Sequence, residues 1–129
     1  MSDQPIVLPP DGGRAYEIGA MRGVFKADGP ETGDRYCASE WFVEPRQTGP
    51  GAHSHEAQEE IFIVTEGTMT FLVGEDWIDA PKGTFLRVPA GITHDFQNRT
   101  DERAGAFNVF IPGGFEVLFS EWSGGPTAE

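Results

Sequence analysis

Cysteine is nearly absent from the sequence: Cys37 is the only one in 129 residues. One cysteine cannot form a disulfide within the chain, so the fold does not rest on a disulfide framework, and this usage is typical of a reducing compartment. Cys37 has no histidine or second cysteine near it in the sequence, which argues against a catalytic thiol.

Basic residues and long apolar runs are also scarce. Nine Lys and Arg stand against 21 Asp and Glu, which gives a formal net charge of −12. Such a surface repels nucleic acid and anionic membranes. The longest apolar run, residues 61–64, is far shorter than the about 20 residues of a membrane helix, and residues 1–13 do not resemble a signal peptide. We therefore expect a cytoplasmic protein with no nucleic-acid and no membrane partner.

Glycine and proline are abundant instead, with 17 and 10 residues. They interrupt the chain too often for long helices and separate short apolar runs, which is typical of an all-β protein. Residues 68–73 alternate between two chemically different faces, as a strand does. The other strands expected after residue 60 are residues 61–64, 77–80, 85–88, 93–98 and 106–111. Strands spaced so regularly indicate a single domain built as a sandwich or small barrel.

The two ends of the chain are expected to differ from this domain. Residues 1–13 are predicted to be an extended arm, residues 14–122 the β-domain, and residues 123–129 a disordered tail. A short C-terminal helix is predicted within the domain, packed against the strands. Its apolar residues recur at helical spacing: Phe115, Leu118, Phe119 and Trp122.

The three histidines, His53, His55 and His94, are candidate metal ligands. His53 and His55 are two residues apart, so in an extended strand both side chains point to the same face. Three imidazoles and one carboxylate converging on a point suit a divalent transition metal and leave a position for water or substrate. An unbroken strand favours Glu59 as the carboxylate, whereas Glu60 requires a turn or bulge after His55. Taken singly, such histidines more often have a structural role.

The residues around these histidines resemble the two sequence motifs of the cupin superfamily, specifically its small single-domain members. The first motif has His-x-His, three or four residues, Glu, six residues and Gly, which matches His53, His55, Glu60 and Gly67. The second motif has Gly, five residues, Pro-x-Gly, two residues, His, three residues and Asn, which matches Gly83, Pro89, Gly91, His94 and Asn98. Both motifs occur in order within residues 53–98, which makes the resemblance specific.

Two positions depart from the family pattern. The glycine that usually opens the first motif, six residues before the first histidine, is Gln47 here, with Gly49 and Gly51 nearby. The aspartate often found after the first glycine of the second motif is Thr84. Neither change affects a ligand position, so both concern loop geometry.

The resemblance implies an all-β, cupin-type double-stranded β-helix, or jelly-roll barrel, that holds one divalent transition metal per chain. The implied ligands are His53, His55, Glu60 and His94. The metal could be Fe, Mn, Ni, Co, Cu or Zn, because imidazole and carboxylate suit all of them.

Apolar residues on the implied barrel strands are candidate walls of a substrate pocket. Those expected to line it are Phe62, Met69, Phe71, Phe96 and Phe107, together with Val64 and Val109. Such walls suit an apolar or aromatic molecule, although most phenylalanines of a small barrel belong to its core. Arg87 could meet an anionic substrate, but we favour the interpretation that it is an exposed surface charge. Asn98 could also face the pocket, but we favour a structural hydrogen bond for its side chain.

The function favoured by the resemblance is a metal-dependent dioxygenase acting on a small organic substrate, with Glu60 also accepting a proton. Residues 112–116 are similar to the tail of bacterial single-cupin proteins related to quercetin dioxygenases. The alternatives are a non-redox isomerase, decarboxylase or lyase, and a non-catalytic small-molecule-binding protein.

Both faces of residues 61–64 are apolar, so one face is expected to be covered by a second copy in a homodimer.

Overall fold

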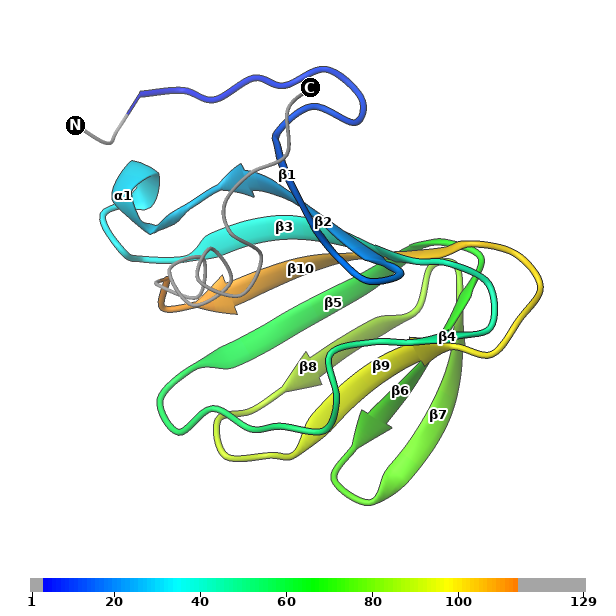
Figure 1. The fold of residues 1–129 in the computed structure, drawn as a ribbon. Helices are drawn as coiled ribbons and strands as arrows, with labels where there is room; N and C mark the ends of the chain where they lie inside the picture. Colours follow the sequence, from blue (N-terminus) through cyan, green and yellow to red (C-terminus); the bar gives the residue numbers. More distant parts are fainter. Residues whose placement is uncertain (1–3, 114–129) are drawn as a thin grey trace.

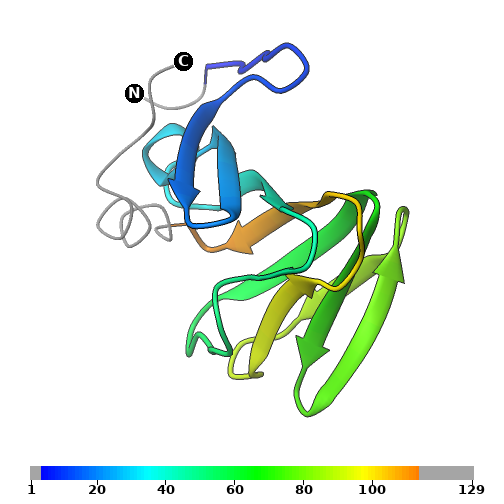
Figure 2. The ribbon, with the colours of Figure 1, turned by 45° about the vertical axis from the view of Figure 1, so that its right-hand side comes forward.

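The computed structural model describes residues 4–113, which form two antiparallel β-sheets that face each other (Figures 1 and 2). One sheet has the strand order β1-β2-β3-β10-β5-β8 and the other β4-β9-β6-β7, so the chain passes repeatedly between the sheets. The strands are β1 (Arg14–Ile18), β2 (Met21–Ala27), β3 (Cys37–Val43), β4 (Gln47–Thr48), β5 (Glu59–Glu66), β6 (Thr68–Val73), β7 (Asp76–Pro81), β8 (Phe85–Val88), β9 (His94–Asn98) and β10 (Ala104–Ile111). This arrangement confirms the predicted all-β jelly roll.

The hydrophobic core lies between the two sheets. In β5, Glu60, Phe62 and Val64 are buried, whereas the residues between them are half-buried or exposed, as the alternation of a strand requires. The large side chains that are almost fully buried include Phe25, Val43, Val64, Met69, Phe71 and Val88. Burial of these side chains is the main source of stability for such a small domain.

Asn98, the last residue of the second motif, joins parts of the chain that are distant in sequence. Its Nδ2 atom donates to the carbonyl oxygens of Val43 at 3.0 Å and Glu102 at 2.6 Å. Its Oδ1 atom accepts a hydrogen bond from the backbone of Thr100 at 2.9 Å. Since Asn98 is only 1% exposed, these bonds satisfy a buried amide, and they agree with the structural role expected for it.

A one-turn helix, α1 (Gly29–Thr32), lies between β2 and β3 and was not predicted from the sequence. The backbone of Glu31 donates to the Asp28 side chain and the backbone of Asp28 donates to the Glu31 side chain, both at 3.0 Å. This capping box, with Pro30 in the first turn, explains the helix. It was missed because a single turn has no apolar periodicity to detect.

Residues 4–13, the described part of the predicted arm, contain no helix or strand. The predicted C-terminal helix and the tail at residues 123–129 lie outside the described residues. Among residues 4–113, no helix has the length and hydropathy needed to cross a membrane.

Candidate metal centre

The segments that carry the histidines are held together by their backbones. His53 and His94 form an isolated antiparallel bridge, with the amide of each donating to the carbonyl of the other at 3.0 and 2.8 Å. The amide of Gly91 donates to the carbonyl of His55 at 2.7 Å, and Gly91 has the positive φ (+86°) that a glycine adopts without strain. Main-chain bonds therefore bring the two sequence motifs together independently of the imidazoles.

Glu60, not Glu59, is the carboxylate that lies with the histidines. Residues 56–57 form a bend after His55, and β5 then begins with Glu59 outside and Glu60 inside the barrel. Glu59 pairs instead with Arg87 at 2.7 Å on the outer surface. This bend is the turn after His55 that Glu60 was expected to need in order to lie with the histidines. Arg87 lies on that outer face, as an exposed charge on an alternating strand would.

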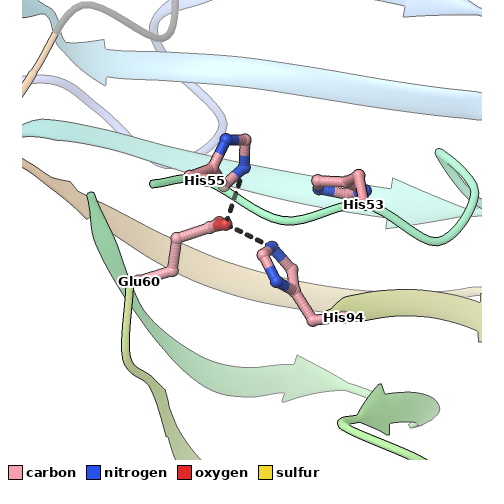
Figure 3. Close-up of side chains that lie close together, drawn as sticks. All are labelled: His53, His55, Glu60 and His94. Carbon is pink, nitrogen blue, oxygen red and sulfur yellow. Dashed lines mark hydrogen bonds and ion pairs between the residues drawn. The ribbon is translucent and has the colours of Figure 1, made fainter. Parts of the chain in front are cut away.

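The side chains of His53, His55, Glu60 and His94 converge (Figure 3). Each offers one ligand atom, and these atoms all lie within 4.8 Å of one another. Oε2 of Glu60 is 2.6 Å from Nε2 of His94 and 3.3 Å from Nε2 of His55. The structure thus brings together all four residues that the resemblance implied as ligands.

Backbone carbonyls orient two of the imidazoles. Nδ1 of His53 lies 2.5 Å from the carbonyl oxygen of Gly51, and Nδ1 of His94 lies 2.9 Å from that of Ile92. A carbonyl only accepts, so each Nδ1 carries the proton and donates it, and Nε2 is the nitrogen that faces the cluster. Metal-binding histidines show this arrangement, in which the second nitrogen donates to a carbonyl or carboxylate.

The charges of the cluster suit a cation. Burial alone would raise the pKa of Glu60, but the neighbouring imidazoles of His55 and His94 lower it to about 2, so the carboxylate is ionised at neutral pH. Burial lowers the pKa of His53 and keeps it neutral. Burial is the largest single influence on His94 and opposes its charge, but the hydrogen bond to Glu60, the charge of Glu60 and the smaller contributions of the Ile92 carbonyl and Asp95 together raise the pKa of His94. Imidazole nitrogens around one carboxylate are a donor set that fits a divalent transition metal.

The cluster opens into a cavity of about 240 Å³ between the sheets. Its apolar walls are mainly Met21, Trp41, Phe62 and Phe96. The polar side chains in the lining are those of His53, Glu60, His94 and Asn108. The cavity can therefore hold a small organic molecule directly against the cluster.

Of the side chains expected to line the pocket, Phe62 and Phe96 do so. Met69 and Phe71 are 0% and 1% exposed in the core and do not contribute to the lining. The structure places Phe107 on the outer side of β10, half-buried and opposite Ile63 of β5. Apolar residues occupy both faces of β10, so period-two alternation could not indicate which face points inward.

Asn108, Met21 and Trp41 line the cavity and were not singled out from the sequence. Asn108 could have been found, because it is the one polar residue in the otherwise apolar stretch 106–111. Met21 and Trp41 carry no such signal, since they belong to early strands whose place beside the histidines depends on the sheet order.

Comparison with known proteins identifies the family. A model described as the cupin domain matches residues 39–110, which is more than half of the chain. No curated protein matches the sequence.

Many solved structures share the fold. One is a predicted oxalate decarboxylase from Thermotoga maritima, 16% identical, with a TM-score of 0.77 over 83% of this chain and 99% of that one. A second is KdgF from Halomonas sp., 13% identical, with a TM-score of 0.74 over 88% of this chain and 100% of that one. A third is the polyketide cyclase RemF from Streptomyces resistomycificus, 21% identical, with a TM-score of 0.73 over 84% of this chain and 80% of that one. At these low sequence identities, the similarity to the solved structures shows only that the fold is shared. Together with the family match and the two motifs on one cluster, it shows that the chain belongs to the cupin family.

Proposed function

We propose that His53, His55, Glu60 and His94 hold one divalent transition metal and that the protein is a metal-dependent enzyme acting on a small organic molecule, with a dioxygenase reaction as the first candidate. The observation that carries the proposal is the convergence of these four side chains at the wall of an apolar cavity. The metal would be Fe, Mn, Ni, Co, Cu or Zn; it could polarise a bound oxygen atom or support chemistry with dioxygen.

The single cysteine supports a cytoplasmic location.

The cavity walls indicate the class of substrate. Trp41, Phe62 and Phe96 offer aromatic surfaces, and the lining formed by residues 4–113 contains no lysine or arginine. A phosphate or a second carboxylate on the substrate would therefore be desolvated there without a cationic partner from the chain. An apolar or aromatic molecule with one ionisable oxygen fits best, with its ring against the aromatic walls and its oxygen toward the histidines.

The choice of reaction rests on the acids and bases that the cavity offers. Glu60 is the sole carboxylate in the lining among the described residues, and its lowered pKa favours a ligand over a strong base. An isomerase depends on a base that takes up and returns a proton, and a carboxylate of such low pKa suits that role poorly. Oxygenation of a substrate that arrives already ionised does not depend on such a base. A non-redox reaction is the second candidate, because structures described as a predicted oxalate decarboxylase and as a polyketide cyclase share the fold.

Turnover in air and under nitrogen tests the reaction class. We expect metal-loaded protein to convert a phenolic or flavonol substrate in air with uptake of oxygen, to stop under nitrogen, and to lose activity in the variant His94→Ala. Conversion that continues under nitrogen would contradict a dioxygenase and support an isomerase, decarboxylase or lyase. A ligand-induced rise in melting temperature without any product would support a binding protein.

The outer face of the six-stranded sheet supports a homodimer. Phe107, Ile63 and Phe85 lie side by side on β10, β5 and β8, and Ile63 and Phe85 are 41% and 62% exposed. A row of apolar side chains across three strands, two of them exposed and the third half-buried, is typical of a surface that a partner covers. We propose that a second copy of this chain is that partner.

Light scattering should give twice the mass of one chain, and Phe85→Lys should give the mass of a monomer by placing a charge in the row. Ile78→Lys is the control, because Ile78 is 44% exposed on β7 of the other sheet. A wild-type monomer, or equal masses for both lysine variants, would contradict this interface.

A further inference from the structure

Asn108 is a buried amide beside the carboxylate of the cluster. It lies on the inner side of β10, is 2% exposed, and is in register with Phe62 of β5 and Ser39 of β3. Its neighbours on the same face of the strand are Ala106 and Phe110. A buried amide among apolar residues is costly unless its hydrogen bonds are made, so its partners indicate its purpose.

Both of its partners accept hydrogen bonds. Nδ2 of Asn108 lies 3.0 Å from Oε1 of Glu60 and 3.3 Å from the carbonyl oxygen of Ile61. An ionised carboxylate and a carbonyl cannot donate, so the atom between them is the amide nitrogen, and both of its hydrogens are used. The bond to Glu60 is charge-assisted, which makes it stronger than a bond between neutral groups.

The two oxygens of Glu60 therefore have different environments. Oε1 is held by Asn108, whereas Oε2 faces Nε2 of His94 at 2.6 Å and Nε2 of His55 at 3.3 Å. A carboxylate can bind a metal through one oxygen or through both, and its rotation decides which. A donor fixed on Oε1 leaves Oε2 as the oxygen directed at the centre of the cluster.

We propose that Asn108 is a positioning residue for the metal centre: it holds Oε1 of Glu60 so that the carboxylate presents Oε2 alone to the metal. This inference rests on the proposed metal site. It assigns a role to a residue outside both sequence motifs and on a strand that carries no ligand. Partners of this kind typically change metal affinity by about 10–100-fold.

The test uses Co²⁺ as the probe and three variants of the full chain. Asn108→Leu keeps the approximate shape and removes both N–H donors, whereas Asn108→Gln keeps an amide donor on a longer side chain that extends toward the cavity. Ser39→Ala is the matched control: Ser39 is in register with Asn108 and 1% exposed, but its hydroxyl accepts from Nε1 of Trp41 at 2.9 Å and is not bonded to Glu60.

Three quantities are measured: the Co²⁺ dissociation constant by chelator competition, the visible absorption spectrum of the Co²⁺ protein, and the melting temperature without metal. We expect Asn108→Leu to weaken Co²⁺ binding about 10–100-fold and to alter the spectrum. Asn108→Gln should regain part of the affinity, and Ser39→Ala should keep the wild-type affinity and spectrum. The spectrum matters because a role in packing alone would lower the melting temperature without changing the coordination of bound cobalt.

The inference is overturned if Asn108→Leu binds Co²⁺ with the wild-type dissociation constant and spectrum, whatever its melting temperature. The proposed metal site is tested separately, by measuring Co²⁺ binding to the wild-type protein. If that protein binds no Co²⁺, the metal site itself is absent and the role of Asn108 falls with it.

Discussion

Replacement of His94 by alanine is expected to reduce the bound transition metal from about one per chain to background. His94 is 4% exposed, and its Nε2 lies closest to Oε2 of Glu60, so its loss removes a ligand and opens the buried side of the cluster. The bridge to His53 uses backbone atoms and remains possible in the variant. We therefore expect a folded protein whose affinity for Co²⁺ falls by more than the about 100-fold that loss of an outer partner can cost. Elemental analysis and Co²⁺ titration measure this.

Two adjacent glutamates give a matched comparison for the same prediction. Glu60→Gln removes the charge from the cluster and should weaken metal binding strongly. Glu59→Gln removes the same charge one residue earlier, where the side chain pairs with Arg87 on the surface, and should leave metal binding unchanged. Metal retained at the wild-type level in His94→Ala, or equal losses in the two glutamine variants, would contradict the assignment of ligands.

Gly49→Ala is expected to lower the free energy of unfolding by about 3 kcal/mol or more. A Cβ atom at position 49 would lie 2.0 Å from the carbonyl oxygen of Phe96 and 3.3 Å from its ring. The backbone must therefore move away from β9, which disrupts the pairing of Gln47 and Thr48 with that strand. The same movement shifts the start of the loop that carries His53. Chemical denaturation of the metal-free protein measures the change.

Gly74→Ala is the control, because Gly74 has a positive φ of +69° and open space around its Cβ position. Only the conformational cost of about 1 kcal/mol is expected there. Equal destabilisation by the two substitutions would show that the close approach of Gly49 to Phe96 has no energetic consequence.

Much of the fold and the site could be predicted because the signals are local. Residues 68–73 alternate cleanly, and the structure has a strand with those bounds. The spacing of His53, His55, Glu60 and His94 matched a family pattern, and the structure brings the four side chains together. Gly49, two residues after the departure at Gln47, lies where the chain passes too close to β9 for a side chain.

What could not be predicted depends on contacts between distant strands. Asn108 stands out in the sequence as a polar residue, but the face of β10 that Asn108 and Phe107 each occupy follows from the pairing of β10 with β3 and β5. Trp41 reaches the cavity from β3 for the same reason. The helix α1 is a different case, since its capping box is local but too short to produce a periodic pattern.

The most direct test of the metal centre is elemental analysis of wild-type protein purified without a histidine tag or chelator, repeated after reconstitution with each candidate metal. We predict about one transition metal per chain, and its identity would direct the assays: a redox-active metal toward oxygen uptake with phenolic substrates, zinc toward non-redox reactions. Protein that binds no metal even after reconstitution would contradict the account, and the cluster would then be a hydrogen-bonded feature of a binding cavity.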